Sequence, residues 1–351
     1  MNASRAPILS VTDGVVLLRA PEPGDAQILI AGRDAVFHRW LGPGVDDPHP
    51  TFCIVVRGKI VGWVDYDDEP EWLLPGEVNV GYNVFARHRG RGYASRAVQL
   101  LMHHLSVCTD ERVARLNIDA GNERSLALAT RLQFRLDRQD QGQWSFQRPV
   151  PPITYTDGVV TLRRPRVEDI DADLLAKDDE QVRWLWLPGQ RATWHAMSPD
   201  AQRDHAQRGL TDRRESFGSG PKWTFSVDAR DADYVAYVDC DLANSQVPAG
   251  EANISYSAHP AYRGRGYVSR SVRLVLHFLY EHTAAREAHL VVDAQNEASL
   301  RVVRAIGAAP AGQWVDDQGR TMVRHVAPVD TAIPARPLSD RGSGPAADTS
   351  T

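Results

Sequence analysis

The sequence contains blocks that recur in the same order, and this repetition limits the possible folds more than any other feature. Residues 12–21 read TDGVVLLRAP and residues 156–165 read TDGVVTLRRP, at a spacing of 144. Thirty residues from Gly76 recur from Gly250 at a spacing of 174, with 15 of the 30 positions identical, and a third block from Asp119 recurs at that same spacing. Collinear blocks of this kind predict two related domains within the 351 residues.

The repeats also place the domain boundaries. We expect a first domain over residues 1–150 and a second over 151–330, joined by the proline-containing stretch RPVPP. The two spacings differ by 30, and the extra length of the second copy falls at 189–222, where a polar sequence predicts one or two helices. Residues 331–351 are rich in Pro, Ala, Ser, Thr and Gly, which is typical of a disordered tail.

Each copy alternates between strand and helix patterns. Strands are predicted at 51–56, 60–65 and 77–85 from β-branched and alternating apolar residues. After Gly92 the apolar positions change to helical spacing, and a further strand and helix follow from Leu116. The fold class is therefore α/β, with helices on a mixed sheet in each copy.

Composition and charge exclude several classes of partner. A formal net charge of -5 and a pI near 6.2 argue against a nucleic-acid binder. The three cysteines form no CxxC pair, so we predict no metal site and a reducing, cytoplasmic location. No secretory signal and no run of about 18 apolar residues is visible, so we predict no membrane association.

A glycine-rich turn joins a strand to a helix in both copies. It reads RHRGRGY from Arg87 and YRGRGY from Tyr262. Glycines let the backbone approach a ligand, and a helix N-terminus attracts negative charge, so the turn predicts a phosphate site. The P-loop pattern GxxxxGK[ST] is absent, and the third glycine of GxGxxG is replaced by Ser95 and Ser269, which disfavours a nicotinamide dinucleotide.

The run R-x-x-G-x-G followed by Tyr-Ala-Ser resembles the acetyl-CoA-binding motif of the GNAT acetyltransferase superfamily. The opening LRxP and the later N-x-x-S, Asn122 to Ser125 in the first copy, are similar to the branch of ribosomal-protein N-terminal and antibiotic acetyltransferases. This resemblance implies two tandem GNAT acyl-CoA N-acyltransferase folds and acetyl-CoA (coenzyme A) as the acetyl donor. One motif position departs between the copies, Arg87 against Ala261, so weaker binding is expected in the second.

The resemblance also implies which residues contact the cofactor. In the family the turn holds the pyrophosphate, the preceding strand lines the pantetheine, and an asparagine holds the pantetheine arm. The corresponding positions in this sequence are Val84, Phe85, Arg87, Arg89, Gly90, Arg91, Gly92, Tyr93 and Asn122 in the first copy, and Ala258, His259, Arg263, Gly264, Arg265, Gly266, Tyr267 and Asn296 in the second.

Direct transfer to an amine needs a base for the amine and a proton for the departing sulfur. The family's tyrosine, seven residues after the asparagine, is replaced by Ala129 and Val303. His103 and His277 correspond to each other but lie off the apolar helix stripe, so we expect them to face solvent. The remaining candidates occupy equivalent places in the two copies, and each could instead cap a turn or strand: Glu77 and Glu251, Asp119 and Asp293, Asp65 and Asp239, Ser125 and Ser299.

The expected function is an acetyl-CoA-dependent N-acetyltransferase acting on an amine of a small molecule, such as an antibiotic or metabolite, or on a protein N-terminus. The longer second copy is expected to be the catalytic one, because the corresponding region of similar enzymes forms the wall beside the acceptor. Two alternatives remain open: a non-catalytic acyl-CoA sensor or scaffold, favoured by the missing tyrosine, and an O-acetyltransferase.

Overall fold

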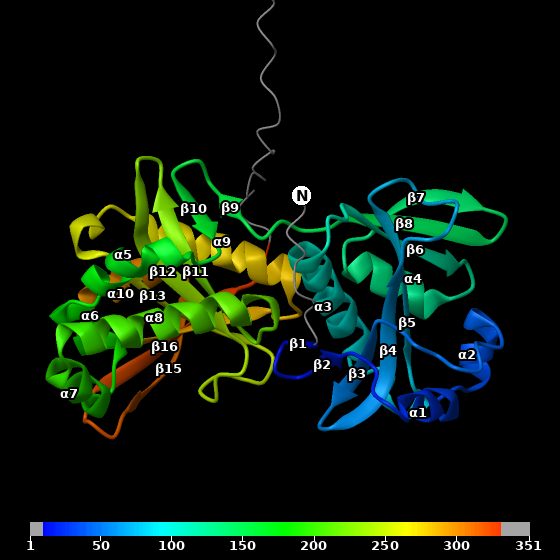
Figure 1. Ribbon diagram of the computed structural model, residues 1–351, viewed down its shortest axis with the longest axis horizontal. Helices are drawn as coiled ribbons and strands as arrows, with labels where there is room; N and C mark the ends of the chain where they lie inside the picture. Colours follow the sequence, from blue (N-terminus) through cyan, green and yellow to red (C-terminus); the bar gives the residue numbers. More distant parts are fainter. Residues whose placement is uncertain (1–9, 331–351) are drawn as a thin grey trace, which may run out of the picture.

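The computed structural model describes residues 10–330, which form two mixed sheets of eight strands each. Each sheet carries its own helices, and the two resulting lobes lie side by side (Figure 1). The predicted α/β class with two tandem units is confirmed. The predicted tail at 331–351 lies outside the described residues.

The first lobe follows the alternation expected from its sequence. Strand β7 was not predicted, because all six of its residues are exposed and it lacks an apolar face. The elements are β1 (Ser10–Thr12), β2 (Leu17–Arg19), α1 (Asp25–Ala31), α2 (Ala35–Leu41), β3 (Phe52–Val56), β4 (Lys59–Asp67), β5 (Glu77–Val84), α3 (Tyr93–Cys108), β6 (Val113–Asp119), α4 (Glu123–Arg131), β7 (Arg135–Asp140) and β8 (Gln143–Pro149).

The second lobe repeats this order with two additional helices, α7 and α8, in its extra length. Ser198 caps the longer of them by accepting a hydrogen bond from the Ala201 N–H. The elements are β9 (Tyr155–Thr156), β10 (Val160–Arg163), α5 (Ile170–Ala176), α6 (Asp179–Leu185), α7 (Pro188–Ala196), α8 (Pro199–Glu215), β11 (Lys222–Ala229), β12 (Ala232–Asp241), β13 (Ala252–Ala258), α9 (Tyr267–His282), β14 (Glu287–Asp293), α10 (Glu297–Ala305), β15 (Ala309–Val315) and β16 (Thr321–Pro328).

Both sheets open at the same place. Strand β5 pairs with β6 in parallel over only three residues, from Glu77 with Val113 to Asn79 with Arg115. Strand β13 pairs with β14 over only two residues, Ala252 with Ala288 and Asn253 with His289. Beyond these pairs the strands separate, while the flanking antiparallel pairings continue. Each lobe therefore has a gap between two central strands, next to its glycine-rich turn.

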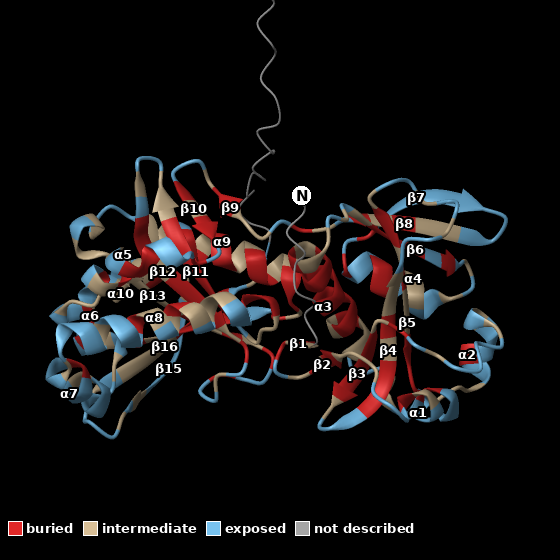
Figure 2. Ribbon diagram, viewed as in Figure 1, coloured by how far each residue is buried: buried red, intermediate tan, exposed pale blue. Residues whose placement is uncertain are grey.

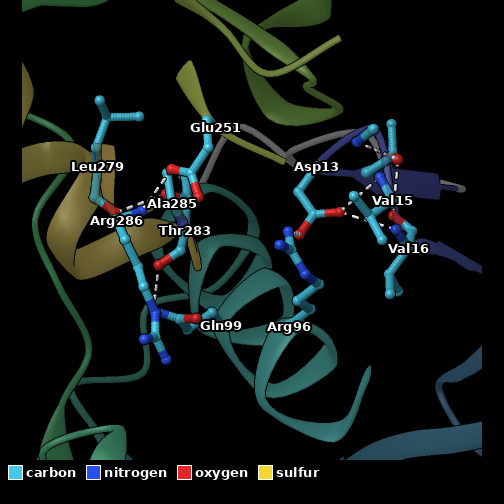
Figure 3. Close-up of polar contacts among 12 residues, drawn as sticks. Asp13, Val15, Val16, Arg96, Gln99, Glu251, Leu279, Thr283, Ala285 and Arg286 are labelled. Atoms are coloured by element: carbon cyan, nitrogen blue, oxygen red, sulfur yellow. Dashed lines mark hydrogen bonds and ion pairs between the residues drawn. The ribbon is translucent and has the colours of Figure 1, made fainter. Parts of the chain in front are cut away.

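The lobes meet through their longest apolar helices, α3 and α9, which are largely buried at the centre of the molecule (Figure 2). The Gln99 side chain donates a hydrogen bond to the Thr283 carbonyl across this contact (Figure 3). The second lobe therefore covers one face of α3, although that face carries polar residues.

The prediction that His103 faces solvent is wrong, because α9 and the segment before β11 cover it. The residue is fully buried, its Nδ1 lies 3.1 Å from Nδ1 of His282, and Trp223 donates from its indole N–H to Nε2 at 3.2 Å. Burial lowers the pKa of His103 to about 4. Its repeat partner His277 is half-buried, with Nε2 3.6 Å from a Glu281 carboxylate oxygen.

Candidate functional site

The glycine-rich turn of the first lobe ends in a helix N-terminus without a side-chain cap. Gly90 and Gly92 have φ values of +76° and +78°, which non-glycine residues adopt at a cost, and Gly92 is the N-cap of the sixteen-residue helix α3. A Cβ added at either glycine would meet nothing within 4 Å, so space lies beside the backbone. The first N–H groups of α3 have no acceptor within the helix, and this makes the turn a cradle for an anion.

The second lobe has the same backbone at its turn. Gly264 and Gly266 both have φ of +76°, and Gly266 is the uncapped N-terminus of α9. The side chain of Arg265 folds back, donating to the Ala261 carbonyl at 3.2 Å and lying over the Tyr262 ring. Both turns can thus hold a phosphate group through backbone N–H groups, but their flanking side chains differ.

A cleft of about 910 Å³ extends from the first turn into the gap between β5 and β6. Its walls are β5, the end of β6, the start of α3, helix α4, and helix α2 with Trp40. The guanidinium of Arg39 stacks over the Trp40 ring, with its carbon 4.3 Å from the ring centre. The sequence interpretation did not select Trp40 as a site residue, although the repeat of Arg39-Trp40 as Arg183-Trp184 was a usable signal.

The side chain of Arg89 is already paired inside the protein. It donates to both carboxylate oxygens of Asp34, at 2.7 and 2.8 Å, and to the Val84 carbonyl at 2.8 Å. This pairing lowers the pKa of Asp34, the N-cap of α2, to about 2. Arg89 was predicted as a cofactor contact, but its guanidinium is occupied by Asp34 and ties the turn to α2.

The second lobe repeats this arrangement, because Arg263 donates to both carboxylate oxygens of Asp178 at 2.6 Å and to Glu180 at 2.8 Å. Both arginines therefore have a structural role, and the cationic side chains that remain at the first turn are Arg87 and Arg91, which are exposed. Partial burial, together with the charges of Arg87 and Arg91, lowers the pKa of the neighbouring His88.

The predicted pantetheine contacts divide between side chain and backbone. Val84 and Tyr93 line the cleft, whereas the Phe85 ring packs over Gly32 inside a separate apolar cluster with Leu29. In the second lobe Ala258 and Tyr267 are half-buried, and Nδ1 of His259 accepts the Ala261 N–H at 3.3 Å. Phe85 can contact a ligand in the cleft only through its backbone.

Asn122 and Asn296 cap helices. Their side-chain oxygens accept the N–H groups of Ser125 and Ser299 at 3.3 and 3.0 Å, at the starts of α4 and α10. Asn122 also lines the cleft. The side-chain amide N–H groups remain able to donate to a ligand.

Glu77 and Glu251 hold strand ends, so neither is placed to act as a base. Arg115 donates to both oxygens of Glu77 at 2.6 and 2.7 Å, and this lowers the pKa of the buried Glu77 carboxylate. One oxygen of Glu251 accepts the N–H groups of Arg286 and Glu287 at 2.8 and 2.7 Å (Figure 3). The structure corrects the proposal of these two acids as catalytic residues, because their oxygens bind protein donors at the far end of β5 and β13.

Asp65 and Asp239 likewise bind neighbouring side chains and backbone. Asp65 accepts from the N–H and hydroxyl of Thr51 at 2.8 and 2.6 Å, and Asp239 accepts from Ser255 and is paired with Lys222 at 3.2 Å. These contacts join adjacent strands. They leave both acids with structural roles.

Among the predicted catalytic residues, Asp119 and Ser125 line the cleft. Asp119 is exposed, and one of its oxygens accepts the Gly121 N–H at 2.8 Å, leaving the other toward solvent. In the second lobe Asp293 is buried and makes the equivalent contact with Gln295 at 2.8 Å, and Ser299 is half-buried. In the first lobe an acid and a hydroxyl therefore reach the cleft of about 910 Å³.

The interpretation from sequence missed Tyr82, which lies on β5 in the cleft wall. Its hydroxyl is buried without a hydrogen-bond partner, and burial raises its pKa. Tyr256 is the repeat partner and is also without a hydrogen-bond partner. The signal was present, since both tyrosines fall in the repeated block at a spacing of 174.

An opened mixed sheet with an uncapped, glycine-rich helix start beside the gap defines an acyl-CoA-type transferase fold. The chain matches the model of the acetyltransferase (GNAT) domain over residues 32–135 and again over 160–309, more than half of its length. It therefore belongs to the GNAT acetyltransferase family, with one GNAT domain in each lobe. No curated protein sequence matches the chain.

Several solved structures are similar to part of this chain. A ribosomal-protein-S5-alanine acetyltransferase from Vibrio fischeri is 14% identical with a TM-score of 0.42, covering 52% of this chain and 100% of its own. RimJ from Mycobacterium smegmatis, in complex with CoA-disulfide, is 18% identical with a TM-score of 0.40, covering 49% and 82%. The microcin C7 self-immunity acetyltransferase MccE, with acetyl-CoA and AMP, is 12% identical with a TM-score of 0.37, covering 49% and 93%.

Within residues 10–330, no helix has the length and apolar character needed to cross a membrane. The same residues contain no group of three or more His, Cys, Asp or Glu side chains arranged to hold a metal ion.

Proposed function

We propose that this protein transfers acetyl from acetyl-CoA directly to an amine, either on a small molecule or at a protein N-terminus, and that the first lobe carries the reaction. The observation that supports this most strongly is the cleft of about 910 Å³ at the uncapped start of α3. It brings an anion cradle, an exposed carboxylate and a hydroxyl to one continuous surface. The extra length of the second lobe favoured the opposite assignment.

The residues present fit coenzyme A. Backbone N–H groups from Gly90 to Tyr93 would hold the pyrophosphate, Val84 would line the pantetheine, and Asn122 would donate to its amide groups. When bound, acetyl-CoA supplies an activated acetyl group as a thioester. Asp119, with one oxygen facing solvent, would accept the proton that the attacking amine loses, directly or through water.

The acceptor would enter from the side of α2, where Trp40 forms the wall of the cleft beside Gly121. A planar aromatic face with a stacked arginine suits an acceptor that carries an apolar or ring-containing group next to its amine. Antibiotics, metabolites and peptide N-termini all meet this description.

A sensor without catalysis remains the second candidate because of one observation. Position 129, where the family's tyrosine would stand, is a fully buried alanine in α4. A protein that binds the cofactor but lacks a proton donor would respond to acetyl-CoA without consuming it.

The test is release of free thiol from acetyl-CoA by the full chain across a panel of amines, hydroxyl compounds and peptides, with the mass of each product measured. We expect acetylated amine and stoichiometric thiol. Binding of coenzyme A by calorimetry with no thiol release on any acceptor would favour the sensor, and acetylated hydroxyl groups would identify an O-acetyltransferase. If the chain neither binds coenzyme A nor acetylates any acceptor, the proposal is overturned.

A further inference from the structure

One polar stripe on helix α3 of the first lobe is covered by the second lobe. Arg96, Gln99 and His103 stand at positions i, i+3 and i+7, so they share one face of the helix. Gln99 donates to the Thr283 carbonyl, and His103 contacts α9. Arg96 lies one turn from the anion cradle, because its N–H donates to the Gly92 carbonyl at 3.1 Å.

The guanidinium of Arg96 contacts both lobes. Its Nη1 donates to Oδ2 of Asp13 at 2.7 Å, and Oδ1 of Asp13 accepts the N–H groups of Val15 and Val16 (Figure 3). The backbone of Gly250, before β13 of the second lobe, lies so close that an added Cβ would be 2.5 Å from Nη2. The side chains of Asp13 and Arg96 are 1% and 17% exposed, so moving the guanidinium would leave a buried carboxylate without its partner.

The turn that carries Asp13 is itself held by the second lobe. The Thr12 N–H donates to the Ser219 carbonyl at 2.9 Å. A Cβ added at Gly14 would lie 2.9 Å from the carbonyl oxygen of Leu242, in the same β12–β13 connection as Gly250. Both members of the ion pair therefore rest on the second lobe, and the start of α3 is supported from outside its own domain.

The second lobe repeats the ion pair without this support. Asp157 and Arg270 are 2.7 Å apart, and Asp157 accepts the N–H groups of the two valines that follow its glycine, as Asp13 does. The side chain of Arg270 is 44% exposed, against 17% for Arg96. The first lobe thus receives a contact on its cradle helix that the equivalent helix of the second lobe lacks.

The glycine at the contact also has a repeat partner. Gly76 has the same φ of +83° as Gly250, so an alanine at either position carries the same backbone penalty. A Cβ at Gly76 would meet only the Cγ of Arg112, in its own lobe, at 3.9 Å. The two glycines differ in that Arg96 of the other lobe lies against Gly250.

We propose that the second lobe positions the anion cradle of the first lobe, and that Arg96 is the positioning residue that transmits this support to the first turn of α3. The free N–H groups of that turn hold an anion only when they converge on it, and a tilted or frayed turn moves them together. The inference rests on the proposed function only in taking coenzyme A as the ligand of this cradle, and it does not depend on acetyl transfer.

The first test measures affinity for coenzyme A by calorimetry on the full chain. Asp13→Asn keeps the oxygen that accepts the two valine N–H groups but removes the charge paired with Arg96, and Gly250→Ala forces the guanidinium aside. Each should weaken the first-lobe site about 3- to 30-fold. The matched controls Asp157→Asn and Gly76→Ala should change the affinity of this site by less than about twofold.

A double variant tests whether the effect passes through Arg96. Arg96→Ala removes the atoms that a Cβ at position 250 would meet. In that background Gly250→Ala should weaken the first-lobe site no more than Gly76→Ala does. A loss that persists without the Arg96 side chain would overturn its assignment as the positioning residue.

A second readout needs no ligand. In Asp13→Asn and Gly250→Ala, amide hydrogen exchange in the first two turns of α3 should be about 3- to 30-fold faster than in the two control variants. If the parent binds coenzyme A but acetylates no acceptor, acetyl transfer fails as the function while these differences still support the inference. Unchanged affinity and exchange in Asp13→Asn and Gly250→Ala, or equal effects in the controls, would overturn it.

Discussion

Gly92→Ala and Gly266→Ala form a matched pair that tests which lobe binds coenzyme A. The two glycines occupy equivalent N-caps with φ of +78° and +76°, and a Cβ at either would meet no atom within 4 Å. Neither substitution causes a clash, so the only penalty is that alanine disfavours the left-handed backbone. The variants should therefore lose equal amounts of stability.

The size of the effect follows from that penalty. Holding an alanine in the left-handed region costs about 1–2 kcal/mol. If the turn relaxes in the free protein to avoid this cost, coenzyme A must restore the left-handed conformation when it binds. The affinity for coenzyme A then falls about 5- to 30-fold. If the turn does not relax, the same energy appears instead as a decrease of roughly 2–8 °C in melting temperature for a domain of this size.

Isothermal titration of coenzyme A into the full chain measures both affinity and the number of sites. We expect Gly92→Ala to weaken the tight site about 5- to 30-fold, and Gly266→Ala to leave that site unchanged. Melting curves of both variants verify that the fold is retained. Wild-type affinity in Gly92→Ala with lost binding in Gly266→Ala would refute the assignment of the cofactor to the first lobe.

Three further predictions follow from particular contacts. Glu77→Gln should lower the free energy of unfolding by about 3 kcal/mol, because it leaves Arg115 without its buried charge partner. Its kcat should change little. A large loss of kcat in a variant that still resists urea would instead indicate that Glu77 acts as a base. Burial lowers the pKa of His103 to about 4 in the folded state, against 6.5 in the unfolded state. The contribution of neutral His103 to the free energy of unfolding is therefore complete above pH 6.5 and falls by about 3 kcal/mol toward pH 4. Urea unfolding of His103→Gln should show a smaller loss over this pH range than the parent. An anion at the first turn raises the lowered pKa of His88, so coenzyme A affinity should increase from pH 8 to pH 6 more in the parent than in His88→Gln, as measured by calorimetry at several pH values.

Much of the fold could be predicted because its signals are local. The strand and helix patterns around β3, β4, β5 and α3 are read from apolar spacing within a few residues, and the glycine-rich turn depends on backbone freedom at Gly90 and Gly92. Because the blocks occur twice, the pattern of an element in one copy could be compared with that in the other. Strand β7 escaped prediction because it is polar and exposed on both faces.

The candidate site was predicted less evenly, because side-chain partners are separated in the chain. Arg89 finds Asp34 55 positions away and Glu77 finds Arg115 38 positions away, so neither side chain is free for the role that its motif implied. Asp119 and Ser125 were selected, and both line the cleft. Tyr82 was not selected although the repeat includes it, because the sequence does not show that its hydroxyl is buried without a partner.

The amino-acid sequence alone established the duplication, the α/β class and the anion-binding turns, since each depends on short-range spacing and backbone preference. Packing decided which polar groups are consumed by internal pairing, which helix face the other lobe covers at His103, and where an open cleft remains. Two copies with nearly the same motif therefore differ in the chemistry available to them, because Asp119 is exposed at the cleft of the first lobe whereas Asp293 is buried in the second.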